Sequence, residues 1–204
     1  MLPERSTAEW QSLDTHHLHP FTDSKTLANK GSRVITSAEG VYLWDSEGNR
    51  LLDGMAGLWC VNVGYGRKEL AQAAYDQMQA LPYYNTFFQS SHPPVIELTQ
   101  KLIEVTPPQF NHVFFVNSGS EANDTVLRMV RRFWSLQGQP EKRVVISRHN
   151  AYHGSTVASA SLGGQQFIHK MDQLPIPDIV HIEQPHWFEN GGDLAPEEYG
   201  LKAA

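Results

Sequence analysis

The stretch HVFFVNSGSEANDTVLRMV, residues 112–130, decides which fold the sequence predicts. His112–Val116 is apolar and β-branched, which is typical of a buried strand. After Ser118-Gly119-Ser120 the apolar spacing becomes helical, so we expect a helix over Glu121–Gln137. A second strand is expected at Arg143–Ser147, and the order strand-helix-strand predicts parallel strands joined by a crossover. The helix residues expected to face inward are Ala122, Val126, Met129, Val130 and Phe133.

Shorter elements are expected on both sides of this unit. Ser6 and Glu9 have capping-box spacing, which predicts a helix running toward His16. Three short strands separated by turn residues predict an antiparallel meander. The strands are Val34–Thr36, Val41–Asp45 and Leu51–Asp53.

Two amphipathic helices are expected between the meander and the parallel unit. The first carries Leu70, Ala74, Met78 and Leu81 on one face and ends at Pro82. The second opens at Pro93-Pro94 and ends before Pro107-Pro108. Farther along, residues 176–185 predict another strand, and residues 196–204 predict the start of a helix. Together these elements predict an α/β protein.

The bulk composition excludes several classes of protein. The chain has 204 residues with a formal net charge of −6 and no basic block, so nucleic acid is not an expected partner. No apolar run approaches the ~18–20 residues of a membrane span, and the first ten residues lack the apolar region of a secretory signal. Cys60 is the single cysteine and cannot form an intrachain disulfide, so we expect a cytoplasmic location.

Ser118-Gly119-Ser120 has two interpretations. A helix N-terminus exposes unpaired N–H groups, so an anion fits there, with Gly119 allowing close approach and the flanking hydroxyls donating. The alternative is an ordinary helix cap with Ser120 as the N-cap and with Glu121 and Asp124 as first-turn acids. The residues alone leave both open.

Tyr152-His153-Gly154 is a second candidate site. It follows the strand predicted at Arg143–Ser147, at the carboxyl end where ligands of open α/β sheets bind. An aromatic ring at that edge could stack on a flat cofactor. The alternative is a core tyrosine followed by a loop histidine. The aromatic segments 53–66 and 81–92 are expected to wall an apolar pocket or simply to pack in a core.

His16, His17 and His19 suggest a metal site by residue type, but we expect none. Neither a cysteine nor a carboxylate is recognised near them at ligand spacing, and ten histidines in 204 residues make chance clusters common. Cys60 lies beside Trp59 without an obvious base, so we expect an inert thiol.

Several segments, in this order, resemble the N-terminal half of the class III, ω-type aminotransferases. They are AEGVYLWDSEGNRLLDGMAGLWCVNVGYG (residues 38–66), LPYYNTFF (81–88), NSGSEANDTVLRMVRR (117–132) and AYHGST (151–156). The resemblance covers nearly the whole chain. It implies fold type I of the transferases that depend on pyridoxal 5'-phosphate (PLP), with antiparallel strands in a small domain and a large, mostly parallel α/β domain. Residues 1–65 are then expected in the small domain and one active-site wall, and residues 66–204 in the first, incomplete part of the PLP-binding domain.

The resemblance also assigns roles to residues. Gly119 and Ser120, flanked by Ser118, resemble the cup that holds the PLP phosphate. Tyr152 resembles the aromatic residue that stacks on the pyridine ring, with His153 and Gly154 shaping its turn. Tyr152 is also expected to border the substrate, together with residues that match pocket-lining positions in the amine transaminases. These are Phe21, Leu58, Trp59 and Phe87, of which Phe87 is expected to reach across a homodimer interface.

The implied reaction is transfer of an amino group from an amine to a keto acid such as pyruvate. The family's Schiff-base lysine, pyridinium carboxylate and substrate arginine lie downstream of the matching segments, in a chain roughly twice this length. No catalytic residue is therefore expected among these 204 residues, which we expect to be inactive alone as the N-terminal part of a longer enzyme. A non-catalytic fragment that binds phosphate, PLP or a partner chain is one alternative. A mutase or decarboxylating relative is another.

Overall fold

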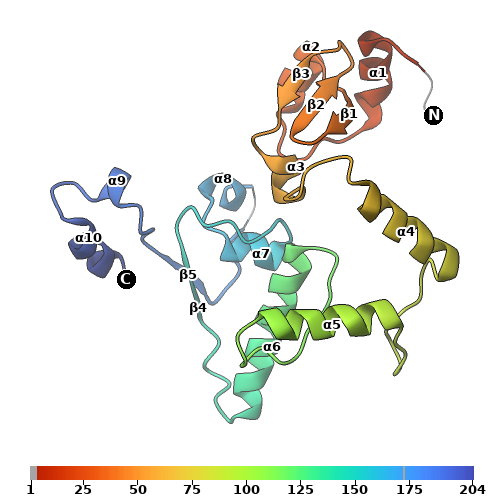
Figure 1. Cartoon of the computed structure of the whole chain (residues 1–204). Coiled ribbons are helices and arrows are strands. Elements are labelled where there is room, and N and C mark those ends of the chain that lie inside the picture. Colours follow the sequence, from red (N-terminus) through yellow and green to blue (C-terminus); the bar gives the residue numbers. More distant parts are fainter. Residues whose placement is uncertain (1–3, 172) are drawn as a thin grey trace. The chain divides into compact units, whose positions relative to one another are not determined.

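The computed structural model describes residues 4–171 and 173–204. It divides into two compact units, one ending at Ile96 and the other running from Glu97 to Ala204, and each unit has its own sheet (Figure 1). The elements of the first unit are α1 (Thr7–Leu13), the 3-10 turn η1 (Asp14–His16), α2 (Ser24–Lys30), β1 (Ile35–Glu39), β2 (Tyr42–Asp45), β3 (Arg50–Leu52), α3 (Ala56–Trp59) and α4 (Lys68–Ala80). Helix α5 (Pro93–Val105) leads into the second unit, which contains α6 (Gly119–Leu136), β4 (Val145–Arg148), α7 (Val157–Leu162), α8 (Gln166–His169), β5 (Ile179–Ile182), α9 (Trp187–Asn190) and α10 (Pro196–Ala203).

The N-terminal unit is built on an antiparallel sheet in the order β1-β2-β3. The predicted meander is confirmed, although its first strand starts at Ile35 and continues to Glu39. The predicted capping box is confirmed as well. The Ser6 hydroxyl accepts a hydrogen bond from the Glu9 amide at 3.3 Å, and Glu9 Oε2 accepts from the Ser6 amide at 2.8 Å.

A carboxylate holds the tight turn between β2 and β3. Asp45 is buried, with 7% of its surface exposed, and its Oδ1 accepts hydrogen bonds from the amides of Glu47 at 3.0 Å and Asn49 at 2.9 Å. Its Oδ2 accepts from the Asn49 side chain at 3.1 Å. These bonds supply the partners that the turn backbone does not find in the sheet.

The C-terminal unit contains a parallel strand pair. β4 and β5 run in register from Val145 opposite Ile179 to Arg148 opposite Ile182, and α7 and α8 lie between them in the chain. Helix α6 packs against α7 (Figure 1). The strand predicted at Arg143–Ser147 is thus confirmed as β4, and the strand predicted within residues 176–185 as β5. The helix predicted from Pro196 is confirmed as α10.

Two expectations for this unit are wrong. Residues 112–116 form no strand, since they make no backbone–backbone hydrogen bond with another segment of the described residues. On α6, Leu127 is the buried residue, whereas Val126, Met129, Val130 and Phe133 are all more than 40% exposed. Spacing identifies which apolar residues share a helix face, but burial depends on which other elements cover that face.

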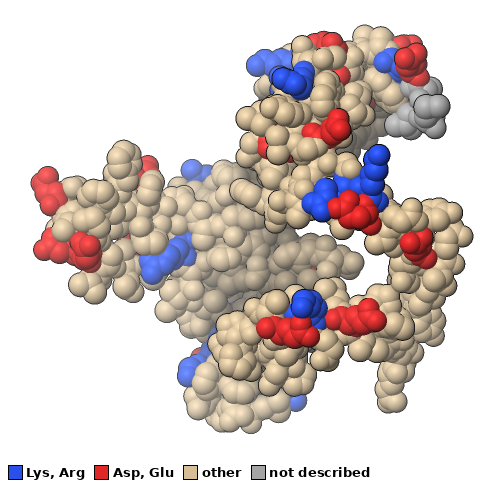
Figure 2. Space-filling view, viewed as in Figure 1, with Lys and Arg blue, Asp and Glu red and all other residues tan. Residues whose placement is uncertain are grey.

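Charged side chains are interspersed on the surface. On the face drawn in Figure 2, basic and acidic residues are scattered among neutral ones and do not gather into a basic patch. Within the described part of the chain, no helix combines the length and the apolar character needed to cross a membrane.

Candidate active site

The first turn of α6 is capped by a serine and closed by a glutamate. Ser118 is the N-cap, and its hydroxyl accepts a hydrogen bond from the Glu121 amide at 3.2 Å. Glu121 Oε2 in turn accepts from the Asn117 amide at 2.8 Å. The interpretation that made Ser120 the N-cap is therefore wrong, because Ser118 already fills that role. This leaves the Ser120 side chain available for other partners.

Two backbone donors are exposed at this helix end. Gly119 and Ser120 open the helix, so neither amide has an acceptor one turn earlier within it. A Cβ built on Gly119 meets no atom within 4 Å, which shows that the space beside it is open. These N–H groups and the partial positive charge of the helix end suit an anion such as a phosphate.

The hydroxyl of Ser120 faces the segment that follows β4. Its Oγ accepts a hydrogen bond from the Ser155 amide at 3.1 Å. That bond uses a lone pair of the oxygen and leaves the hydroxyl proton free to donate to a ligand. The Ser120 carbonyl oxygen lies 2.9 Å from the hydroxyl of Ser159, which is fully buried in α7.

A carboxylate of α6 caps the next helix. Asp124 Oδ1 lies within 2.9 Å of the Thr156 hydroxyl, 3.0 Å of the Ser159 amide and 2.8 Å of the Ser159 hydroxyl. Helix α7 begins at Val157, so the Ser159 amide belongs to its unpaired first turn. A negative carboxylate at that position satisfies the amide and also interacts favourably with the helix dipole.

The residues on either side of Gly154 approach α6 closely. The Asn123 side chain donates a hydrogen bond to the His153 carbonyl oxygen at 2.7 Å. Gly154 is buried at φ +133°, and a Cβ there would lie 2.5 Å from Ser120 Oγ and 3.0 Å from Ser120 Cα. Only glycine accommodates both this φ and this approach. We call Ser120, Asn123 and Asp124 the α6 clamp, because together they hold residues 153–159.

Tyr152 lies directly before the clamped residues. It follows β4, which ends at Arg148, and 54% of its surface is exposed. His153 is exposed too, and its backbone carbonyl accepts the bond from Asn123. The structure therefore brings together all six residues expected to bind the cofactor, Ser118, Gly119, Ser120, Tyr152, His153 and Gly154, at the joined ends of α6, β4 and α7.

Leu58 and Trp59 lie in a strained turn of the N-terminal unit. Ala56, Gly57, Leu58 and Trp59 have φ values of +46°, +60°, +60° and +64° in succession. A left-handed conformation costs roughly 1–2 kcal/mol for each residue other than glycine. Strain of this kind persists only where other bonds fix it, and it is concentrated at functional sites.

Asp53 supplies bonds that fix this turn. Its Oδ2 accepts from the Gly57 amide at 2.8 Å and from the Tyr65 hydroxyl at 2.7 Å, and its Oδ1 accepts from the Met55 amide at 3.2 Å. The Tyr65 hydroxyl, followed by the Gly57 amide, lowers the pKa of Asp53. The same hydrogen bond to Asp53 raises the pKa of Tyr65. The ionised carboxylate is therefore the form that stabilises the turn.

The other two predicted pocket residues are also exposed. Phe21 has φ +50° and is 68% exposed. Phe87 is 69% exposed, and its ring centroid lies 6.0 Å from that of Phe88. Phe21, Leu58, Trp59 and Phe87 all belong to the N-terminal unit, so their part in one site with the α6 clamp stays a prediction.

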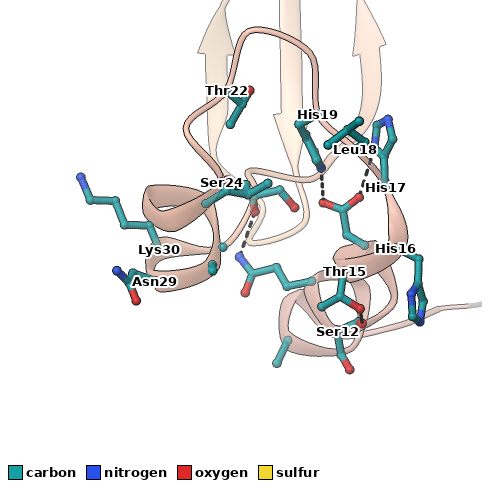
Figure 3. A pocket seen from close by; sticks show the side chains of 17 residues that line it. Ser12, Thr15, His16, His17, Leu18, His19, Thr22, Ser24, Asn29 and Lys30 are labelled. Atoms are coloured by element: carbon teal, nitrogen blue, oxygen red, sulfur yellow. Dashed lines mark hydrogen bonds and ion pairs between the residues drawn. The ribbon is translucent and has the colours of Figure 1, made fainter.

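The histidine cluster differs from expectation. Asp14 lies beside two of the three histidines, with its Oδ2 2.8 Å from His19 Nε2 and its Oδ1 3.4 Å from His17 Nδ1 (Figure 3). The premise that no carboxylate accompanies these histidines is therefore wrong. The sequence signal was the Asp14-x-x-His17-x-His19 spacing, which folds together because η1 turns the chain immediately after Asp14.

Residues 26–196 match the family described as aminotransferase class-III. The chain belongs to the class-III aminotransferases. This confirms the family expected from the sequence, and with it fold type I, of which the chain contains the antiparallel strands and part of the parallel sheet. Class-III aminotransferases depend on PLP, so the expected cofactor is confirmed for the family.

Curated relatives in the family are longer than this chain. A putrescine–pyruvate aminotransferase of Pseudomonas aeruginosa is 63% identical over 199 residues, which are 97% of this chain and 44% of the relative. A diaminobutyrate–2-oxoglutarate transaminase of Halomonas elongata is 42% identical over 161 residues, 79% of this chain and 34% of the relative. The chain thus spans less than half the length of these relatives.

Solved ω-transaminase structures agree with this fold. An (S)-enantioselective ω-transaminase from Thermomicrobium roseum superposes with a TM-score of 0.92 at 39% identity, covering 99% of this chain and 45% of that structure. A thermostable ω-transaminase variant from Pseudomonas jessenii gives a TM-score of 0.90 at 38% identity, covering 95% and 43%.

The donors at the start of α6 fit the phosphate end of the aminotransferase cofactor. The Gly119 and Ser120 amides and the Ser118 and Ser120 hydroxyls are hydrogen-bond donors, and the space beside Gly119 is open, which suits a phosphate dianion. Sequence reasoning missed Asn123 and Ser159 and saw Asp124 only as a first-turn acid. Their partners lie 30 to 39 residues along the chain, so local spacing carries no signal for these contacts.

The lysines of the chain lie outside this arrangement. All seven, at positions 25, 30, 68, 101, 142, 170 and 202, are exposed. Lys101 Nζ bonds Glu104 at 2.7 Å, and Lys142 Nζ lies 3.4 Å from the centroid of the Trp134 ring. These contacts are those of surface lysines.

Proposed function

We propose that the complete protein transfers an amino group from an amine or ω-amino compound to a keto acid, with pyruvate as acceptor and a diamine such as putrescine as donor. The observation that carries the proposal is the α6 clamp, which fastens the segment after Tyr152 to the same helix turn that presents Gly119 and Ser120. Family membership and the putrescine–pyruvate aminotransferase at 63% identity support the reaction and the substrates.

The residues of the chain would bind and orient the cofactor. The Gly119 and Ser120 amides and the Ser120 hydroxyl hold the phosphate, while the positive end of the α6 dipole offsets its charge. Tyr152 would stack on the ring, and the bond from Asn123 to the His153 carbonyl fixes the backbone next to Tyr152. When bound, PLP supplies an electron sink for charge that develops on the substrate carbon.

The substrate pocket is proposed to include residues of the N-terminal unit. Asp53 holds Leu58 and Trp59 in a left-handed turn. This turn presents their two large apolar side chains from a fixed backbone. Phe21 and Phe87 supply further apolar surface for the hydrocarbon part of an amine. Such walls also exclude water from the reacting atoms.

The assembly is proposed to be a cytoplasmic homodimer with an active site at the subunit interface. Phe87 and Phe88, at 69% and 95% exposed, are large apolar side chains that need cover, and Phe87 is the residue proposed to reach the partner subunit. The single cysteine supports a reducing compartment. The proton-transferring lysine is proposed to come from outside these 204 residues, so this chain alone is expected to be inactive.

The test uses the complete protein. Purified enzyme with PLP, putrescine and pyruvate should form alanine at a rate proportional to enzyme concentration. Ser120→Ala should raise the PLP dissociation constant about tenfold, because one hydrogen bond to a charged group contributes roughly 1.5–3 kcal/mol and part of it is replaced by water. Ser135→Ala, in the same helix but far from its first turn, is the control. If the enzyme formed no alanine with any amine tested, the proposed function would be refuted. Unchanged PLP binding in Ser120→Ala would refute the phosphate site.

A further inference from the structure

A carboxylate lies between two imidazole rings at the end of α1. Asp14 Oδ2 lies 2.8 Å from His19 Nε2, and its Oδ1 lies 3.4 Å from His17 Nδ1. One ligand atom from each residue lies within 4.8 Å of the others, and the two histidine rings are 4.3 Å apart between centroids. Figure 3 shows His17 and His19 turned toward the same carboxylate.

These separations suit a shared ion. An ion held at roughly 2.0–2.2 Å by nitrogen and oxygen ligands in tetrahedral geometry brings neighbouring ligand atoms to about 3.3–3.5 Å from each other. The Asp14 carboxylate lies 2.8 Å from His19 Nε2 and 3.4 Å from His17 Nδ1, so a small widening of the His19 contact admits an ion between the three groups. Two imidazoles and a carboxylate are a donor set typical of zinc and of other first-row transition metals.

The surroundings of the cluster support the same function. Gln11 and Ser32 lie around the same cavity as the cluster, and the Gln11 side chain donates to the Ser32 carbonyl oxygen at 2.8 Å. Asp14, His17 and His19 line an open cavity of about 800 Å³, which leaves room for water as a further ligand. The side chains of Asp14 and His19 are 26% and 21% exposed, so they are partly ordered by packing yet reachable.

We propose that Asp14, His17 and His19 bind one divalent transition-metal ion, with Zn²⁺ as the representative ion and water completing the coordination. The ion would join the end of α1 to the segment that leads to Phe21. Because only the folded chain brings the three residues together, bound metal would also stabilise the N-terminal unit. The proposal is independent of the aminotransferase reaction.

The test measures metal binding to the complete protein without a histidine tag. After removal of metal, equilibrium dialysis against Zn²⁺ should show one bound ion per chain. In His17→Ala and in Asp14→Ala the affinity for this ion should be at least tenfold lower. His16→Ala is the matched control. His16 and His17 are neighbouring, exposed histidines, but only His17 belongs to the cluster. In His16→Ala the binding should stay as in the unmodified protein.

A second measurement reports the ligands directly. Co²⁺ in place of Zn²⁺ should give visible absorption of a tetrahedral nitrogen–oxygen site in the unmodified protein and in His16→Ala, and none in His17→Ala. Since His17 is 62% exposed, its loss should leave the far-ultraviolet circular dichroism unchanged, which excludes unfolding as the cause. Equal Zn²⁺ binding by His16→Ala and His17→Ala, or no binding by the unmodified protein, would overturn the proposal.

Discussion

At the scale of single residues, Asp45 shows how one buried acid makes a turn depend on pH. The Asn49 side chain, and then the amides of Asn49 and Glu47, lower the pKa of Asp45 below its ordinary value. A lowered folded-state pKa means that the ionised carboxylate stabilises the folded state above the unfolded-state pKa. This contribution is lost as the pH falls through the folded-state pKa.

Asp45→Asn should therefore lower the urea midpoint of unfolding at pH 7. The NH2 group that replaces one carboxylate oxygen cannot accept a hydrogen bond, so a bond from Asn49 or Glu47 is lost. The difference from the unmodified protein should shrink as the pH is lowered from 7 to 3. Urea titrations followed by circular dichroism at several pH values measure it. Asp76→Asn, on the exposed face of α4, is the control and should show a smaller difference at every pH. A difference for Asp45→Asn that persists undiminished at pH 3 would contradict this prediction.

Alanine substitutions at two glycines of the candidate site should have opposite effects on stability and on PLP binding. Gly154→Ala should destabilise the protein by roughly 1–3 kcal/mol, because φ is +133° and the added Cβ would lie 2.5 Å from Ser120 Oγ. Gly119→Ala places its Cβ in open space, so stability without cofactor should be unchanged or slightly higher. The methyl group would instead occupy space proposed for the phosphate, so PLP binding should weaken.

Thermal unfolding with and without PLP separates these effects. For Gly119→Ala, the loss should appear only as a smaller PLP-induced shift in Tm. For Gly154→Ala, Tm should fall even without cofactor. If Gly119→Ala bound PLP as the unmodified protein does, the cup would not lie beside Gly119.

At the scale of elements, Asp124 joins α6 to α7. Its Oδ1 is the acceptor shared by Thr156 and by the amide and hydroxyl of Ser159. Asp124→Ala should cost about 2–4 kcal/mol of stability, since it removes a helix cap and leaves the buried Ser159 groups without this acceptor. Asp124→Asn keeps one acceptor oxygen, so it should recover part of that loss.

Chemical denaturation of the complete protein measures this prediction, and visible circular dichroism of bound PLP adds a second readout. Because the clamped residues begin directly after Tyr152, the dichroism of the bound cofactor should change in Asp124→Ala. Glu104→Ala, which breaks an exposed ion pair on α5, should leave both signals nearly unchanged. Equal stability of Asp124→Ala and the unmodified protein would contradict the capping role.

Each helix expected from the sequence is present, whereas one expected strand is not, for a physical reason. Helix hydrogen bonds are local, so the cap at Ser6 and the prolines at 93–94 were sufficient to locate α1 and α5. A strand needs a neighbour, and residues 112–116 have the composition of a strand without a strand beside them in the described residues. The antiparallel meander was predictable because its partners are joined by short turns.

At the scale of the whole molecule, most large apolar side chains of the chain are exposed. Phe88, Leu18, Phe188 and Leu201 are more than 80% exposed, and the buried apolar residues among those described are all in the C-terminal unit. Surface of this kind requires cover by other protein, which agrees with a chain that spans less than half the length of its relatives. The lysine proposed to bind PLP is likewise expected outside these 204 residues.

Borohydride reduction of the complete holoenzyme locates that lysine. Reduction should fix PLP to one lysine outside residues 1–204, because none of the seven lysines here is buried or belongs to the clamped segment. Peptide mass spectrometry after digestion identifies the site. Stoichiometric label on any lysine of this chain would show that its own residues supply the proton-transfer group.

The sequence alone determined the family and the helices α1, α4, α5, α6 and α10, because each depends on residues close together in the chain. Only the tertiary structure decided that Ser118 rather than Ser120 caps α6, that Asp124 caps α7, and that Asp14 lies between two histidines. A cap, a clamp or a metal site depends on which polar atoms meet in space. Each polar atom takes whichever partner the packed elements bring within about 3 Å, and local spacing does not specify that partner.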